Sequence, residues 1–276
     1  INLVATLVLS SSAVFLGYIS PLVLAVFIVS MSVVHTFMNA IPAIYLGAPE
    51  DEANALNVLP GHKMLLAGRG YEALLLTVIG SFLALVVGIV IAPLIIKILP
   101  VIYETIQEYI GYILIVIVVF LILREKQKYL AFFVFILAGV FGLTVLNLNL
   151  KNPMFPLLSS LFGIAGLLIS LKDKVEIPKQ EITKTDISKL EIGKAVGAGS
   201  LVGSFATMMP GLGPAQAAII GSQLVKLSDK GFLVLVGALD TLGMVMSFVA
   251  LFAIEKARNG AVVVISRLLE EIVKKI

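Results

Sequence analysis

The chain has 276 residues, of which 59% are hydrophobic and only 13% are charged, and its mean hydropathy is +1.09. Soluble domains carry about a quarter charged residues, so this composition predicts an integral membrane protein. The absence of cysteine excludes disulfides and cysteine nucleophiles, and two histidines, His35 and His62, are too few for a histidine-rich metal site. The net charge of +3, without basic patches interleaved with aromatics, excludes a nucleic-acid partner.

The first 49 residues contain no Asp, Glu, Lys or Arg. They predict two membrane segments, 1–19 and 21–46. The chain opens inside an apolar stretch, with neither Met nor the basic start of a signal peptide, so we expect further residues before Ile1. Pro42 lies late in the second segment, and we expect that helix to end or unwind there.

A polar stretch at 47–70 follows, and its acidic residues at 50–52 are typical of the first turn of a short helix. Beyond it, long uncharged runs alternate with short polar loops. These runs predict membrane spans at 73–96, about 101–123, 129–150, 152–171 and 231–254.

A second polar stretch divides the chain into two halves. Residues 172–194 carry six lysines, several acidic residues and a proline, and predict a cytoplasmic linker that is helical only near Lys184–Leu190. The first membrane half then covers 1–171 and the second covers 195–276. The C-terminal tail spaces apolar residues against charged ones, which predicts an amphipathic helix at the membrane interface.

The stretch 195–226 organises the second half. It is long enough to cross a bilayer, but Pro210, Gly211, Gly213 and Pro214 interrupt its centre. Because proline removes a backbone donor and glycine adds conformational freedom, we expect two half-helices that meet at a Pro-Gly tip. Such backbone is tolerated at membrane depth where protein or water satisfies it, as in transporter binding sites. A proline-kinked continuous span is the alternative.

Charge counting indicates an internal repeat. Basic loops belong on the cytoplasmic side, and counting spans from them gives the segments 20–38 and 230–248 opposite orientations. These segments align with Ser30 opposite Asp240. The sequence therefore predicts an all-α integral membrane protein of two inverted structural repeats, with broken or re-entrant helices meeting at Pro-Gly tips. The N-terminal part of the first repeat is expected to be missing.

The Pro-Gly tip predicts a site for an organic anion. A helix N-terminus presents N–H groups without acceptors and a partial positive charge, and glycine lets a carboxylate or phosphate approach the backbone closely. Polar side chains near the tip add hydrogen bonds, and the first repeat contributes residues of its own. The candidate substrate-binding residues are Thr207, Pro210, Gly211, Gly213, Pro214, Gln216, Asn2, Asn39 and Pro42.

Asp240 is the only ionisable residue in the predicted span 231–254. Because a charged side chain inside a membrane is costly, an intramembrane acid predicts a functional site. We expect Asp240, helped by Thr241, to couple transport to Na⁺ or H⁺. The alternative is a protonated carboxyl, or one bonded to backbone at a helix contact. The first repeat carries a polar series that either joins helices or adds Ser30 and His35 to the coupling site, namely Ser30, Ser32, His35, Thr36 and Asn39.

Two stretches of the chain resemble a known family. They are IPAIYLGAPEDEANALNVLPGHKMLLAGRGYEAL (41–74) and GSLVGSFATMMPGLGPAQAAII (199–220). In them the chain resembles the large permease of tripartite tricarboxylate transporters, in a short archaeal-type form. It departs from the family pattern at His62, where an aromatic residue is usual, and at Pro42-Ala43, where the family has Pro-Gly.

The resemblance implies a secondary-active permease of the cell membrane that moves a di- or tricarboxylate-like organic anion, coupled to Na⁺ or H⁺. It implies no enzymatic reaction and no bound cofactor. The partners it implies are the lipid bilayer, the anion, a small membrane subunit and an extracytoplasmic binding protein, and it leaves a homo-oligomer open.

A fainter likeness to polyprenyl-phosphate translocases, which share Pro-Gly membrane hairpins, leaves a lipid-carrier translocase as the alternative function. An intramembrane aspartyl protease would need two facing aspartates, and the sequence offers Asp240 no second one within a span. The sequence contains neither a GxSxG motif nor a P-loop, so nothing supports a serine hydrolase or a P-loop nucleotidase.

Overall fold

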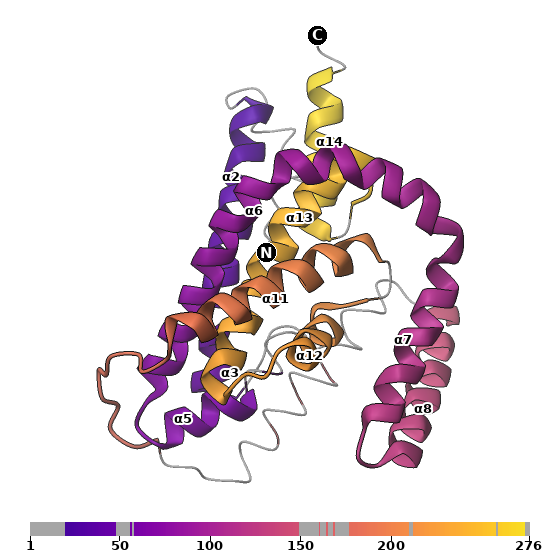
Figure 1. Cartoon of the computed structure of the whole chain (residues 1–276). Coiled ribbons are helices and arrows are strands. Elements are labelled where there is room, and N and C mark those ends of the chain that lie inside the picture. Colours follow the sequence, from indigo (N-terminus) through magenta and orange to yellow (C-terminus); the bar gives the residue numbers. More distant parts are fainter. Residues whose placement is uncertain are drawn as a thin grey trace. The chain divides into compact units, whose positions relative to one another are not determined.

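The computed structural model describes residues 20–47, 56, 58–148, 160, 164, 168, 177–209, 212–257 and 259–273. Within these residues every regular element is a helix (Figure 1). In the same part of the chain, the helical stretches 22–45, 70–124, 128–147 and 229–254 are long and apolar enough to cross a membrane. This confirms an all-helical fold suited to a membrane. The predicted segment 1–19 and most of the predicted span 152–171 lie outside the described residues.

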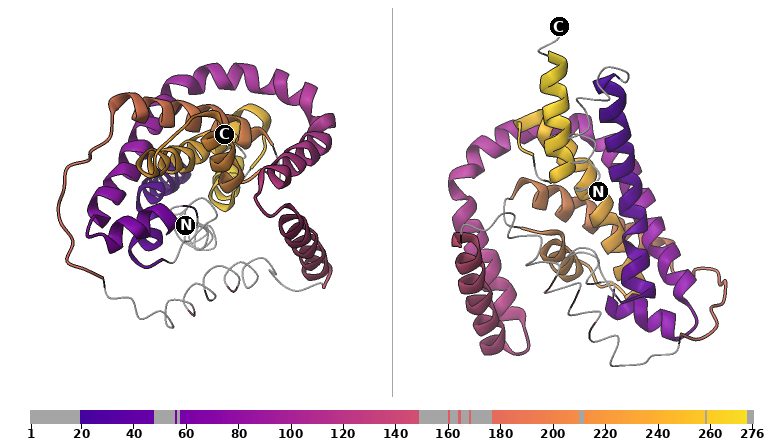
Figure 2. Two further views of the ribbon diagram at one scale, coloured as in Figure 1. Left: turned by 60° about the horizontal axis from the view of Figure 1, so that its bottom comes forward. Right: turned by 180° about the vertical axis from the view of Figure 1, so that it is seen from behind.

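The chain forms two compact units. One comprises residues 1–105 and 176–276, and the other comprises residues 106–175. The first unit holds the segments that carry the candidate residues. It includes both copies of the predicted repeat, residues 20–38 and 230–248 (Figure 2). The predicted division at the linker 172–194 concerns repeats rather than compact units, and it stays a prediction.

Helix α2 spans Pro21–Met38 and α3 spans Ala40–Tyr45. The expectation that the helix ends or unwinds at Pro42 is wrong in position, because the break lies at Asn39 and Pro42 is inside α3. The reason is that Pro42 has no N–H to donate to the carbonyl one turn earlier, so the helical ladder fails before the proline rather than at it. The backbone resumes its hydrogen bonds at once, since Leu46 N donates to Pro42 O over 3.0 Å.

A short π-helix, η1 (Val58–His62), and α5 (Lys63–Leu66) lead into the long helix α6 (Gly70–Ile106). The predicted loop at 97–100 is absent, since α6 continues through it with Pro93 and Pro100 inside the helix. Proline inside a helix kinks it without having to end it when apolar surroundings favour the helix. Figure 1 shows α6 curving in its C-terminal half.

The second unit contains a 3₁₀ turn, η2 (Gln107–Tyr109), and two helices that pack on each other, α7 (Ile110–Arg124) and α8 (Lys128–Asn147). Helix α8 has no buried residue. Its surface is apolar along its whole length, as expected of a span that faces lipid. The helix covers residues 129–147 of the predicted span at 129–150, and it is long and apolar enough to cross a membrane.

The linker before the second half is ordered by specific hydrogen bonds. Residues 177–188 form no regular element, so the expected helix near Lys184–Leu190 begins only at Lys189. Glu181 N donates to Gly68 O over 2.9 Å, and Gln180 accepts from Gly70 N over 2.9 Å and donates to Leu65 O over 3.0 Å. These bonds give the linker's backbone partners in place of a helix and tie it to the start of α6.

The carboxylate of Glu72 is fully buried beside this linker. It accepts hydrogen bonds from Arg69 and pairs with Lys230 Nζ over 2.9 Å, and Asp186 N donates to it over 3.3 Å. Lys230 also donates to Asp186 O over 2.7 Å. A buried charge is stable only when it is paired and hydrogen-bonded in this way, so these groups join α6, the linker and the next helices.

The broken stretch forms two helices, α11 (Lys189–Met208) and α12 (Pro214–Leu224), and Met209, Leu212 and Gly213 between them belong to neither helix. This interruption was predicted, although the re-entrant course of the segment stays a prediction. Helix α13 (Asp229–Ile254) follows and covers the predicted span at 231–254 with a helix long and apolar enough to cross a membrane, and α14 (Gly260–Val273) ends the described chain. The predicted interfacial position of α14 stays a prediction, and its apolar residues Ala261, Val264, Ile265 and Leu268 share a core cluster with α2.

Helix α13 is the centre of the first unit. It contacts α2, α11, α12 and α14, and its residues dominate the main core cluster. Glycines bring α6 against it: a Cβ at Gly80 would overlap Val234 O, and a Cβ at Gly237 would overlap Thr77 O. Ser81 Oγ donates to Gly237 O over 3.0 Å at the same crossing. Small residues therefore let the two helices approach to backbone contact, as is typical of membrane helix pairs.

Candidate functional site

Four polar side chains meet between α2 and α13, and we call them the polar cluster: Thr36, Asn39, Asp240 and Thr241. Asn39 Nδ2 donates to Asp240 Oδ2 over 3.0 Å, and the hydroxyl oxygens of Thr36 and Thr241 lie 2.9 Å apart. Asp240 is half-buried, and the other three residues are buried. The polar cluster joins residues from the two segments that the sequence aligns as a repeat.

The hydrogen-bond directions within the polar cluster follow from chemistry. Thr36 Oγ1 donates to Val33 O over 2.7 Å, because a carbonyl oxygen only accepts. Its one proton is thus used, so Thr241 must be the donor in the bond between the two threonines. Ser32, one turn earlier on α2, is buried and donates to Ile28 O over 2.7 Å. The helix face of Ser32, Thr36 and Asn39 is therefore the face that meets α13.

Helices α2 and α13 run antiparallel (Figure 1). Near the start of α2, Leu24 and Ile28 share a core cluster with Phe248 and Leu251 of α13. Near the end of α2, Thr36 and Asn39 bond to Thr241 and Asp240, which lie earlier in α13. Opposite directions are what two inverted copies of one segment require.

The other first-repeat candidates are Ser30, His35, Pro42 and Asn2. Ser30 is exposed and is not part of the polar cluster. His35 is half-buried on α2, and its carbonyl accepts from Asn39 N over 3.0 Å. Pro42 is inside α3, and Asn2 lies outside the described residues.

The second group of candidates surrounds the break between α11 and α12. Thr207 Oγ1 donates to Gly203 O over 2.8 Å, Gly213 is the extended residue before α12, and Pro214 begins that helix. Pro210 and Gly211 lie outside the described residues. Because Ala217 N bonds to Gly213 O over 3.1 Å, the N–H groups that α12 leaves without helical acceptors are those of Ala215 and Gln216.

The α11–α12 segment holds three buried polar atoms whose partners are missing. Gln216 Oε1, Ser200 Oγ and Ser204 Oγ are buried, and none has a hydrogen-bond partner. Several hydroxyls on other described helices bond to their own backbone, as those of Thr77 and Ser247 do. A buried polar atom without a partner costs about 1–3 kcal/mol, so such atoms are candidates for binding a ligand. Sequence reasoning missed both serines, because a helical serine usually bonds to its own backbone.

The α11–α12 segment and the polar cluster share α13. Gly203 of α11 lies against Leu239 and Leu242, which flank Asp240 and Thr241 in the sequence. Gly199, one turn earlier, lies against Leu235 and Ala238. Helix α13 therefore contacts α11 on one face and holds the polar cluster with α2 on another, at the same level.

Comparison with known proteins identifies the chain's relatives. Residues 1–272 match the family described as the tripartite tricarboxylate transporter TctA family. The chain belongs to this family. The TctA family takes its description from transporters, which agrees with a helical membrane fold and with the resemblance noted at 41–74 and 199–220.

One relative of this TctA-family chain is an uncharacterized protein of Methanocaldococcus jannaschii, which is 31% identical over 242 residues. The matched region covers 85% of this chain and 60% of the relative, so the chain spans about 60% of that relative's length. An archaeal relative is consistent with the archaeal-type form expected from the sequence. No solved structure matches the chain.

Proposed function

We propose that the chain is the permease of a secondary-active transporter that moves a di- or tricarboxylate-like organic anion, coupled to Na⁺ or H⁺. Membership of the TctA family supports transport of this class. The observation that carries the proposal of coupling is the hydrogen bond between Asn39 and Asp240 over 3.0 Å. The bond ties the carboxylate of Asp240 to the end of α2. Asp240 lies on α13, which also packs against α11 and α12 of the broken segment.

The anion would bind at the start of α12. The backbone N–H groups of Ala215 and Gln216 have no acceptor within the helix, and the helix dipole favours negative charge at this end. The side-chain oxygen of Gln216 is buried without a partner, so the amide can rotate to present its NH₂ group to a carboxylate. Thr207 lies just before the break, and it would complete the site from α11.

The cation would bind at the polar cluster. The cluster supplies a carboxylate, hydroxyl oxygens and an amide at one level of α2 and α13. Na⁺ could use these oxygens, and H⁺ could instead reside on the Asp240 carboxyl. In both cases Asp240 must be able to carry a negative charge. That charge is costly inside the membrane, and a bound cation or proton neutralises it.

Coupling would pass through α13. A cation that neutralises Asp240 changes the contact between α13 and α2, and Leu239 and Leu242 connect the same stretch of α13 to Gly203 of α11. Because α11 leads directly to the anion site, the two sites bias one packed element. This is the physical form that a coupling free energy between two sites requires.

An inverted-repeat architecture fits this mechanism. The antiparallel course of α2 and α13 is consistent with it, and alternating access in such folds rocks one repeat against the other around a central site. A tripartite system would add a small membrane subunit and an extracytoplasmic binding protein. The same reading involves no enzymatic reaction and assigns the chain to the cell membrane.

Ligand-induced thermal stabilisation of the full chain in detergent tests the proposal. The panel is citrate and other di- and tricarboxylates, with and without Na⁺, and a short polyprenyl phosphate as a separate arm. A ligand that binds only the folded state raises the melting temperature by mass action. We expect a carboxylate to stabilise the protein, and either Na⁺ or a lower pH to strengthen the effect.

Two carboxyl-to-amide variants on α13 sharpen this test. Asp240→Asn should abolish the dependence of the stabilisation on Na⁺ and pH. Asp229→Asn should leave that dependence unchanged. Asp229 lies on the same helix as Asp240 but forms an exposed ion pair with Lys63 of α5. Equal coupling in both variants and the wild type would refute the role of Asp240. Stabilisation by the polyprenyl phosphate alone would refute the proposed substrate class.

A further inference from the structure

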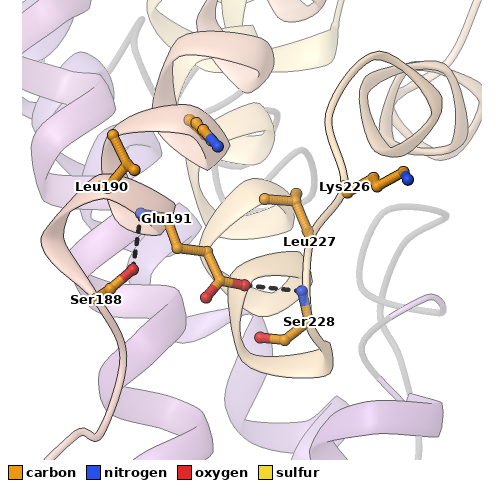
Figure 3. Close-up of a pocket in the computed structure, with 7 residues that line it drawn as sticks. Ser188, Leu190, Glu191, Lys226, Leu227 and Ser228 are labelled. Carbon is orange, nitrogen blue, oxygen red and sulfur yellow. Dashed lines mark hydrogen bonds between the residues drawn. The ribbon is translucent and has the colours of Figure 1, made fainter.

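A pocket of about 430 Å³ lies between the first turn of α11 and the segment that joins α12 to α13 (Figure 3). It belongs to the first unit, and its lining residues include none of the residues of the two proposed transport sites. The residues that line it are Ser188, Leu190, Glu191, Lys194, Lys226, Leu227 and Ser228.

Two lysines supply positive charge to this pocket. Lys194 and Lys226 are exposed, and neither forms an ion pair with any described residue. The one carboxylate present is already engaged, because Glu191 accepts from Ser228 N over 2.7 Å, a bond drawn in Figure 3. The lining residues therefore carry one net positive charge, from two ammonium groups and the Glu191 carboxylate.

Two serine hydroxyls add further donors. Ser188 Oγ accepts from Glu191 N over 3.2 Å, and Ser228 Oγ accepts from Gly231 N over 3.2 Å. These capping bonds use the oxygen lone pairs and leave each hydroxyl proton to donate elsewhere. The pocket thus offers two ammonium groups and two hydroxyl protons. Phosphate oxygens accept both kinds of bond.

If α13 crosses a bilayer, the pocket at its first turn lies near the membrane surface. Leu227 and Ser228 directly precede α13, whose 26 residues form a candidate membrane span. Apolar side chains flank the lysines, since Leu190 is 70% exposed and Leu224 is 59% exposed. Exposed leucines beside lysines suit the boundary where acyl chains meet headgroups. A soluble anion has no acyl chain that would contact these leucines.

We infer that this pocket binds the phosphate of an anionic phospholipid, with Lys194 and Lys226 as ion partners and Ser188 and Ser228 as hydroxyl donors. The flanking leucines would then contact the upper acyl chains of the same lipid. Such a lipid would hold α11 and α13 together at their first turns, where Glu191 already bonds to Ser228. This site is separate from the proposed transport sites and does not depend on them.

Binding of individual lipids to the full chain in detergent, measured by native mass spectrometry, tests the inference. The probes are phosphatidylglycerol, phosphatidylcholine and inorganic phosphate. Each basic residue near an anionic lipid contributes about fivefold in affinity, so Lys194→Gln or Lys226→Gln should each weaken the first phosphatidylglycerol about fivefold. The double variant should weaken it about thirtyfold, and Lys194→Arg/Lys226→Arg should retain it.

Lys126→Gln/Lys128→Gln is the matched control, because it removes two exposed lysines from another loop. Retained phosphatidylglycerol binding in this control, together with weak binding of phosphatidylcholine, is the expected result. The inference fails if the control loses as much affinity as the pocket variant, or if phosphatidylcholine binds equally well. It also fails if inorganic phosphate displaces phosphatidylglycerol at millimolar concentration, since the pocket would then take a soluble anion.

Discussion

Asn39 donates a hydrogen bond to Asp240 over 3.0 Å and so joins two residues that lie 201 positions apart in the sequence. One turn away, Thr36 and Thr241 form a second bond between the same two helices. The pair of bonds fixes both the level and the rotation of α2 against α13, because a shift by one residue would separate all four groups. The polar cluster is therefore a structural contact as well as the proposed cation site.

Replacing Thr36 with valine should destabilise the protein by about 1–3 kcal/mol. The substitution keeps the side-chain volume but removes the oxygen that accepts from Thr241, which is fully buried. The loss would be measured as a shift in the unfolding midpoint in detergent. Thr241→Val should cost less, because Thr36 keeps its hydrogen bond to Val33 O.

The double variant Thr36→Val/Thr241→Val tests whether the two effects belong to one bond. Replacing both partners leaves no buried hydroxyl without a partner, so the double variant should be less destabilised than the sum of the singles by about 1 kcal/mol. Strict additivity would show that the two hydroxyls do not interact. Thr105→Val, at an exposed threonine that bonds only to its own backbone, should change stability little.

Gly237→Ala should destabilise the protein by about 1–3 kcal/mol, because the new Cβ would overlap Thr77 O and force α6 away from α13. Gly243→Ala on the same helix provides the comparison. A Cβ there meets nothing within 4 Å, so the higher helix propensity of alanine should leave stability unchanged or slightly raised. Equal melting temperatures for the two variants would contradict the close crossing of α6 and α13.

Stability should fall in acid through Glu191. The hydrogen bond from Ser228, aided by the charges of Lys194 and Lys230, lowers the pKa of Glu191 below its ordinary value. A lowered folded pKa means that this group's contribution is fully present above the unfolded pKa and is lost as pH falls through the folded pKa. The free energy of unfolding should therefore fall when it is measured from about pH 6 downward, through the ordinary glutamate pKa of about 4.3.

Glu191→Gln isolates that contribution. The variant should be less stable than the wild type near neutral pH, and the difference should shrink as the solution becomes acidic. Glu181→Gln, at another exposed glutamate of the same region, serves as the control and should not change the pH dependence. A constant difference between wild type and Glu191→Gln across the range would contradict the assigned pKa direction.

The spans that the sequence predicted best are those with uninterrupted apolar composition. α8 and α13 match their predicted ranges to within a few residues, and the interruption near Pro214 was predicted from proline and glycine chemistry. The expected loop at 97–100 failed for a physical reason. Lys97 and Pro100 resemble a loop locally, but a long side chain can reach the surface and a proline can bend a helix that its neighbours stabilise.

The candidate site was only partly predictable. Asp240 and Asn39 stood out as polar residues in apolar runs, but their bond depends on tertiary packing that one sequence does not encode locally. Ser30 was assigned by alignment to Asp240, yet Ser32, Thr36 and Asn39 follow the helical period and Ser30 does not. Helical geometry alone would have placed Ser30 on another face. Glu72 gave only a weak signal, as one acid at the start of an apolar run.

The ion pair between Glu72 and Lys230 constrains how α13 can move. Lys230 lies in the first turn of α13, and the carboxylate of Glu72 and the carbonyl of Asp186 hold it there. A helix held at its first turn can tilt about that turn but cannot slide along its axis. Asp240 lies ten residues, or about 15 Å, from Lys230, and the far end at Ile254 lies farther still. If α13 moves, this ion pair favours a tilt about its first turn, with a smaller displacement at Asp240 than at Ile254.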